Sequence, residues 1–255
     1  MNKDRLSPNS LVGRISVGNY GGSILILVLL VAVTVYLSNN TFELSSLLPY
    51  RSLITKGFFN TILVSIISLI GSMILGFFLY VLAISRIGIF RAFSDVFTEL
   101  MYGTPMLVLI FVMGFVVGPA YGSLNRPLWG IVAIILYMAP YMMNVLKASI
   151  SSIPEEQYMA MELFGFSTVQ KYRYIIIPQV IKILMPPLMN NFSLIIKGSA
   201  LLNVLSYPEL FYAVKVAGSK TLAYTEGYVL MWGLYLIITI PLSQLTKYFE
   251  RRFGV

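Results

Sequence analysis

The polar side chains that could do chemistry in this sequence lie within long apolar runs. Asn190, Ser193 and Lys197 are spaced i, i+3 and i+7, so a helix presents all three on one face. A lysine inside a membrane span costs about 2.5–3.5 kcal/mol to insert, so it usually faces protein or water. We therefore expect Lys197 to line a polar path and to meet a carboxylate or a backbone carbonyl. The alternative is a lysine whose stem reaches the membrane interface.

Two further positions accompany this face. Asn191 lies on the same segment and adds another amide to the expected lining. Thr104 precedes Pro105 at the start of another apolar run, where it could contact a ligand. The simpler interpretation, which we favour, is a capped helix start with proline in the first turn.

Catalytic chemistry has almost no candidates. The chain contains no histidine and no cysteine, which excludes disulfides, thiolate zinc sites and histidine or cysteine catalysis. No acidic residue lies inside an expected span, so a membrane enzyme acting on lipid or peptide bonds lacks its acid–base groups. No G-x-x-x-x-G-K-[ST] phosphate loop is present. We expect a chain that is not an enzyme and carries no cofactor of its own.

The elements that position these residues are expected to be membrane-spanning helices. The chain has 255 residues, 58% of them hydrophobic, with a mean hydropathy of +0.82, which is too apolar for a water-soluble globule of this size. Runs without charge are long enough for helices of about 20 residues. The sequence predicts an all-α polytopic membrane protein with six spans, at roughly 22–38, 58–84, 102–118, 128–150, 181–203 and 227–246.

Charge asymmetry predicts the orientation. Of the 18 lysines and arginines, twelve fall in segments that share a side with the N-terminus, five fall on the opposite side, and Lys197 lies in a span. Because positive charge concentrates in cytoplasmic segments, both termini are expected inside. The net charge of +8 therefore reflects membrane topology and not nucleic-acid binding.

One inner segment is unusually polar. Residues 154–180 read PEEQYMAMELFGFSTVQKYRYIIIPQV. Ser152 to Glu155 and Ser167 to Gln170 each have the spacing of a capping box, and Gly165 suits a left-handed helix end. The segment is therefore predicted as helix, glycine turn, helix. It either rests on lipid as an amphipathic hairpin or docks into a groove of a partner protein.

Here the sequence resembles the permease subunits of ABC importers. Their cytoplasmic loop has E-A-A, three residues, G, nine residues, I, one residue, L-P. Gly165, Ile175 and Pro178 match this spacing, and Met159-Ala160-Met161 occupies the E-A-A position, so the glutamate is missing. Glu156 and Glu162 lie i−3 and i+3 from Met159 and could substitute for it from the same face.

The resemblance extends over about 190 residues and is specific to the polar-amino-acid branch. ELMYGTPMLVLIF, at 99–111, resembles E-x-x-R-G-T-P-x-x-x-Q, with Tyr102 in place of arginine and Leu109 in place of glutamine. NNFSLIIKGSALLNVLSYPEL, at 190–210, resembles N-E-F-x-x-x-x-K-D-T-S-L, with Asn190 and Lys197 matching. Asn191, Gly198 and Ala200 replace the branch's Glu, Asp and Ser.

The resemblance implies a bacterial inner-membrane importer for a small polar solute, with an amino acid as the default. It implies a second permease subunit, an extracytoplasmic solute-binding protein, and cytoplasmic ATPases that bind ATP and Mg and dock on the loop 152–178. The loop residues assigned to this docking are Glu156, Met159, Ala160, Glu162, Gly165, Phe166 and Gln170. Residues 1–50 would add a lead, one helix and an outer loop to a five-helix core, 51–255. Because charged signature positions are neutral here, a permease-like subunit that assembles or senses without transporting is the alternative.

Overall fold

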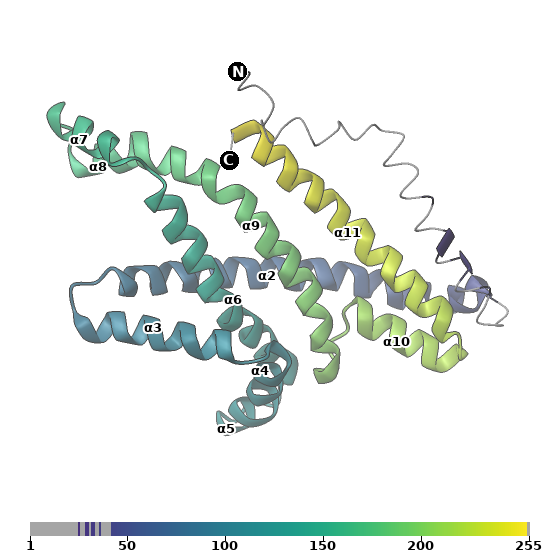
Figure 1. The fold of residues 1–255 in the computed structure, drawn as a ribbon. Helices are drawn as coiled ribbons and strands as arrows, with labels where there is room; N and C mark the ends of the chain where they lie inside the picture. The colour runs from purple at the N-terminus through teal and green to yellow at the C-terminus, as the bar shows by residue number, and fades with distance from the viewer. Residues whose placement is uncertain (1–24, 26–28, 31, 34–35, 37–41, 254–255) are drawn as a thin grey trace, which may run out of the picture. The chain divides into compact units, whose positions relative to one another are not determined.

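A computed structural model of the chain describes residues 25, 29–30, 32–33, 36 and 42–253. The chain divides into two units, residues 1–45 and 46–255, and the second contains helices α2 (Arg51–Ala83) to α11 (Tyr224–Phe253) (Figure 1). The described residues contain no strand. The span expected at 22–38 lies largely outside the described residues.

The helices follow one another with short connections. In chain order they are η2 (Leu44–Tyr50), α2 (Arg51–Ala83), α3 (Gly88–Gly103), α4 (Met106–Val112), the π-helical turn η3 (Met113–Val117), α5 (Gly118–Ala120), α6 (Arg126–Ser151), α7 (Glu155–Leu163), α8 (Thr168–Gln170), the π-helical turn η4 (Lys171–Ile176), α9 (Ile177–Ser199), η5 (Ala200–Leu205), α10 (Leu210–Thr221) and α11 (Tyr224–Phe253).

Four of the expected spans are present as long helical runs. Among the described residues, the runs long and apolar enough to cross a membrane are Leu44–Ala83, Arg126–Ser151, Thr168–Leu205 and Tyr224–Phe253. They contain the stretches expected at 58–84, 128–150, 181–203 and 227–246. Helix α6 continues through the buried Pro140 to Ser151.

The stretch expected at 102–118 differs from the prediction. It is the second part of a pair, Gly88–Gly103 and Met106–Ala120, bent by 106°. Pro105 forces the residue before it out of the helical region, and Thr104 accordingly has an extended backbone (φ −101°, ψ 125°). Thr104 therefore ends α3 and does not begin the next helix. Helix α3 was missed because its charges, Arg91, Asp95 and Glu99, interrupt the apolar pattern.

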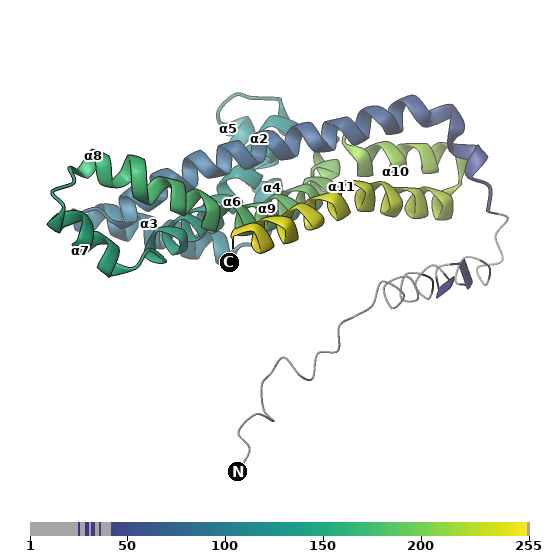
Figure 2. The same ribbon diagram turned by 90° about the horizontal axis from the view of Figure 1, so that it is seen from above.

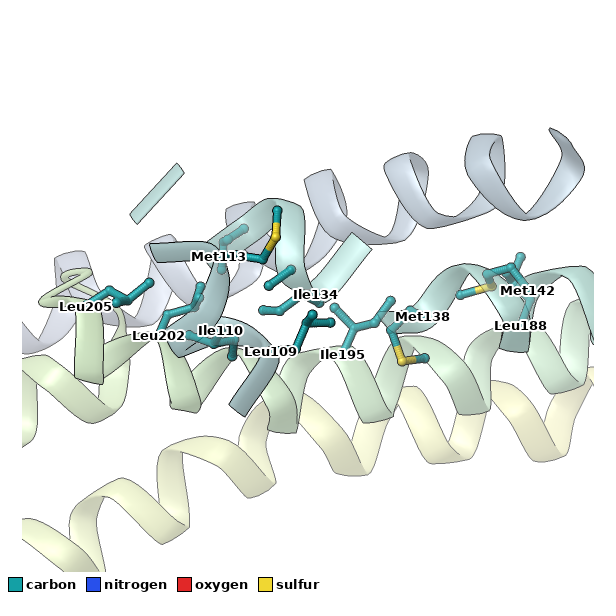
Figure 3. Close-up of a cluster of buried hydrophobic side chains, with 12 residues drawn as sticks. Leu109, Ile110, Met113, Ile134, Met138, Met142, Leu188, Ile195, Leu202 and Leu205 are labelled. Carbon is teal, nitrogen blue, oxygen red and sulfur yellow. The ribbon is translucent and has the colours of Figure 1, made fainter. Parts of the chain in front are cut away.

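The largest core lies where α4, α6 and α9 meet, as Figure 3 shows. Ile110, Ile134 and Ile195 are fully buried there, and Leu202 of η5 closes one end. Their side chains come from segments far apart in the sequence. This core fixes α9, and with it the polar face at 190–197, relative to α4 and α6.

Helices α2 and α6 pack closely because α2 presents small residues. Thr61, Ser65, Ser68 and Ser72 are fully buried on α2. A Cβ atom built on Gly76 would lie 2.7 Å from Met142 Cβ and 2.8 Å from the Ala139 carbonyl oxygen. No side chain fits at Gly76, so the two backbones can approach one another as small residues allow in membrane helices.

The segment 204–226 is too mixed in composition to span a membrane, which predicts a short surface helix there. It contains α10, but Ala213, Val214 and Ala217 of this helix are buried against neighbouring helices. The Glu209 side chain caps α10 by accepting hydrogen bonds from the Phe211 and Tyr212 backbone amides, at 2.7 and 2.8 Å. The helix is therefore part of the packed structure and not a surface element.

Candidate functional site

The first candidate site is the loop hairpin, residues 152–178, which contains α7, α8 and η4. Figures 1 and 2 both place α7 and α8 side by side at one end of the second unit, away from α10. A small core of its own anchors the hairpin, with Ile153, Met161, Ile176 and Val180 buried together. The hairpin is thus a packed structure held at the ends of α6 and α9.

The turn between α7 and α8 is built as the sequence predicted. Gly165 has a φ of +70°. The Phe166 amide donates to the Met161 carbonyl at 3.0 Å and the Gly165 amide to the Glu162 carbonyl at 2.9 Å, which is the hydrogen-bond pattern of a Schellman helix end. Helix α8 then begins with a complete capping box, because Gln170 Oε1 accepts from the Ser167 amide and Ser167 Oγ from the Gln170 amide.

The other expected capping box is wrong. Ser152 is the last residue of the α6 end, and its hydroxyl donates to the Ser149 carbonyl at 2.8 Å. Helix α7 begins after Pro154 without a side-chain cap. Glu155 and Glu156 in its first turn instead interact favourably with the positive end of the helix dipole.

The two glutamates expected to replace the missing loop glutamate differ in their contacts. Glu162 Oε1 lies 3.1 Å from Lys171 Nζ, an ion pair that joins α7 to η4 across the glycine turn. Glu156 is exposed and makes no ion pair with another described residue. Both carboxylates are solvent-exposed, since the Glu162 side chain remains 72% exposed beside Lys171, but Glu156 can meet a partner without breaking an ion pair.

The exposed surface of the hairpin carries large apolar side chains beside its glutamates. Met159 is 54% exposed, Leu163 89% and Phe164 81%. Ala160 is half-buried beside them. Phe166 packs against the small core of the hairpin, so it supports the turn from inside. Leu163 and Phe164 were missed because spacing alone does not show which residues of a short helix face outward.

The second candidate site is a polar groove between α9 and α11. A pocket of about 290 Å³ is lined by Asn190, Ser193, Lys197, Thr239, Ile240, Ser243 and Thr246. The structure thus brings together the three α9 side chains that were expected on one face. The α11 residues were missed, although Thr239, Ser243 and Thr246 have the helical spacing i, i+4, i+7 that could have identified them.

Two of the expected lining residues lie elsewhere. Asn191 is buried on another face of α9, where its amide nitrogen lies 3.7 Å from Met142 Sδ. Thr104 donates its hydroxyl hydrogen to the Leu100 carbonyl at 2.6 Å and does not line the groove. Met106, two residues later, does reach α9, because a Cβ atom built on Gly198 would lie 3.0 Å from Met106 Sδ.

An aromatic cluster surrounds Tyr102, the residue at the arginine position of the resembled motif. The Asn144 amide donates to the Tyr102 hydroxyl at 2.6 Å. The rings of Tyr102 and Tyr141 are 4.9 Å apart in an edge arrangement, and those of Tyr137 and Tyr141 are stacked 5.8 Å apart. The cluster ties the end of α3 to α6 without a charged group.

Glu209 is a buried carboxylate outside the spanning helices. It accepts hydrogen bonds from two backbone amides and from the Tyr235 hydroxyl, at 3.1 Å. These bonds favour the ionised form, but burial outweighs them and raises the pKa of the Glu209 carboxyl to about 7. Among the described residues, no three acidic side chains converge as a metal site would require.

Several helices long enough to cross a membrane, with a polar groove between two of them, suit a component of a membrane transport system. Residues 72–255 match the family described as the binding-protein-dependent transport system inner membrane component. The chain belongs to this family, as the resemblance in its loop indicated.

Curated relatives cover most of the chain. It is 33% identical over 213 residues to a probable glutamine ABC transporter permease protein, GlnM, of Bacillus subtilis, a match that spans 82% of this chain and 97% of the relative. It is 28% identical over 222 residues to a probable amino-acid ABC transporter permease protein, YckA, of the same organism, covering 86% and 95%.

Solved structures share the fold. A chain of an amino acid ABC transporter crystallised with histidines superimposes with a TM-score of 0.75 at 26% identity, over 84% of this chain and all of that one. The inward-facing MetNI methionine ABC transporter aligns with a TM-score of 0.61 at 17% identity, which shows the common fold alone.

Proposed function

We propose that this chain forms the translocation pathway of an ATP-driven importer for a small polar solute, and that the solute is an amino acid. The family and the amino-acid permease relatives support the importer and the solute class. ATP and Mg would bind to the ATPase partner, and this chain would supply no cofactor site. Its environment is a bacterial inner membrane, with both termini cytoplasmic.

The observation that carries the proposal is the reach of the hairpin. The helical run Thr168–Leu205 has 38 residues and is therefore about 55 Å long, against about 30 Å for the hydrocarbon core of a bilayer. The excess length can hold α7 and the glycine turn away from the membrane. Apolar Leu163 and Phe164 at the tip then need a protein groove, which favours docking over rest on lipid.

We propose that the docking contact is mainly apolar, made by Met159, Leu163 and Phe164, with Glu156 as its carboxylate. Motion of the ATPases would reach the spanning helices through the core of the hairpin, which joins the ends of α6 and α9. A second permease subunit and an extracytoplasmic binding protein complete the assembly. The chain itself hydrolyses nothing in this scheme.

Because the chain has no cysteine, Leu163→Cys introduces a single thiol at the tip. In membrane vesicles, a water-soluble maleimide should label it, and co-assembly with the ATPase should block the labelling. Arg126→Cys, at the opposite end of α6, is the matched control and should be unaffected by the ATPase. Protection of a tip thiol by lipid alone, without the ATPase, would contradict the docking role.

One observation favours the non-transporting alternative. Met159 stands where the loop glutamate is expected, and Glu162 is already paired with Lys171. Reconstitution with the ATPase and the binding protein separates the two functions. For a transporter, ATP hydrolysis rises when solute-loaded binding protein is added, and an amino acid is taken up. For an assembly or sensing subunit, no amino acid is taken up.

A further inference from the structure

The groove between α9 and α11 has two walls with different hydrogen-bonding capacity. The α9 wall consists of Asn190, Ser193 and Lys197, and the α11 wall of Thr239, Ser243 and Thr246. The two helices run in opposite directions (Figures 1 and 2). Lys197 and Thr239 therefore share one end of the groove, and Asn190 and Thr246 share the other, about 10 Å away.

On the α11 wall, both threonine hydroxyl hydrogens already make hydrogen bonds within the helix. Thr239 Oγ1 donates to the Tyr235 carbonyl at 2.9 Å, and Thr246 Oγ1 donates to the Leu242 carbonyl at 3.0 Å. Each hydroxyl has one hydrogen and two lone pairs. Toward the groove, both threonines can therefore only accept hydrogen bonds, whereas Ser243 between them makes no hydrogen bond within residues 42–253 and can donate or accept.

On the α9 wall, the polar side chains make no hydrogen bond or ion pair within the described residues. Within residues 42–253, Lys197 makes no ion pair or hydrogen bond, and the same holds for the Asn190 and Ser193 side chains. The lysine ammonium can only donate, while the asparagine amide can both donate and accept. No aspartate or glutamate lines the groove.

We propose that the groove is a recognition site for a zwitterionic amino acid with an uncharged side chain. Its carboxylate binds Lys197 and its ammonium binds Thr239 Oγ1 at the same end. The side chain extends toward Asn190 and Thr246, where an amide finds both a donor and acceptors. This inference rests on the proposed function and assigns Thr239 and Thr246 as specificity-determining residues.

The charge of the groove excludes one class of amino acid. The α-ammonium keeps its own carboxylate as a counter-charge, whereas a guanidinium or ammonium side chain meets only neutral oxygens at the Asn190 end of a groove whose single charge is already positive. A charge that leaves water without a counter-charge is disfavoured. Cationic amino acids should therefore bind more weakly than neutral ones of similar length.

The test measures direct binding to the permease–ATPase complex in lipid nanodiscs, without the binding protein, so that its own selectivity does not contribute. The probes are L-glutamine, L-arginine and 4-carbamoylbutanoate, which is glutamine without its amine. Thr239→Val should weaken L-glutamine binding about tenfold, the effect of losing one charge-assisted hydrogen bond, and leave 4-carbamoylbutanoate binding unchanged. Lys197→Met should weaken both. Wild-type complex should bind L-arginine about tenfold more weakly than L-glutamine.

Ser149→Ala is the matched control, because Ser149 on α6 also donates its hydroxyl hydrogen to a carbonyl four residues earlier, at 2.8 Å. It should change no affinity. Unaltered binding of 4-carbamoylbutanoate by Thr239→Val also shows that the groove of this variant is intact. Equal loss of both probes in Thr239→Val, equal binding of L-arginine and L-glutamine, or no L-glutamine binding by wild type would each overturn the inference.

A parallel assay keeps the two proposals apart. ATP-driven amino-acid uptake is measured in proteoliposomes that hold the same complex, with the binding protein added outside. If uptake occurs but the binding profile fails, only the assignment of the groove falls. If the wild-type complex takes up no amino acid, the proposed function itself fails and the inference falls with it.

Discussion

Substitution of Gly165 tests the hairpin most directly. The residue has a φ of +70°, and a Cβ atom built on it would have no neighbour within 4 Å. Gly165→Val therefore introduces no clash. The substitution destabilises the turn because a residue with a Cβ atom pays about 1–2 kcal/mol to adopt the left-handed backbone conformation.

That cost acts on the turn between α7 and α8. A loss of 1–2 kcal/mol multiplies the population of the opened turn about 5- to 30-fold. The hydrogen bonds from the Gly165 and Phe166 amides are lost with it. We expect the spanning helices to stay folded while docking to the ATPase weakens. Gly165→Asn should cost less, because asparagine tolerates this conformation better.

The assay measures ATP hydrolysis and solute uptake together in proteoliposomes. Gly165→Val should reduce uptake per ATP hydrolysed, and Gly165→Asn should retain more of it. Gly122→Val is the control, since Gly122 also has a φ of +70° with no neighbour within 4 Å but lies in the loop between α5 and α6. Equal uptake by Gly165→Val and wild type, or equal loss in Gly122→Val, would refute the reasoning.

Three more predictions concern stability. Gly76→Ala should lower the melting temperature of the purified protein, because its Cβ atom would lie 2.7 Å from Met142 Cβ. Gly233→Ala is the control: its Cβ atom would have no neighbour within 4 Å, so it should stabilise α11 by about 0.5–1 kcal/mol. A stable Gly76→Ala would contradict close α2–α6 packing. Ser167→Ala should reduce the stability of the first turn of α8 by about 1 kcal/mol. The Gln170 backbone amide should then exchange its hydrogen faster, and an unchanged exchange rate would reject the capping role. Because the pKa of Glu209 is raised from 4.5 to about 7, its ionisation costs stability, so the free energy of unfolding should fall between about pH 4.5 and 7 and level off above. Glu209→Gln should abolish this slope, and an unchanged slope would assign it to other groups.

Much of the architecture could be predicted from the sequence because its causes are local. A run of apolar residues long enough to cross a bilayer spans it whatever surrounds it, which is why 128–150 and 227–246 were found. The helix end at Gly165 and the capping box from Ser167 to Gln170 also depend on neighbouring residues alone.

Local patterns failed where several local outcomes were possible. Ser152 has the spacing of an N-terminal cap, but α6 extends to Ser151 and the serine closes that helix instead. Thr104 could begin a helix or end one, and Pro105 favours the second by extending its backbone. The charges of α3 concealed a helix that runs beside α2.

The sequence by itself determined the membrane class, the helical hairpin and the single face of Asn190, Ser193 and Lys197, because composition and helical spacing are properties of the chain. Only the tertiary structure decided that Thr239 and Thr246 complete this face, that Asn191 turns away, and that Phe166 points inward while Phe164 is exposed. The physical reason is that helical periodicity determines which side chains share a face of one helix. Which of those faces packs against protein depends on the packing of helices that are distant in the sequence.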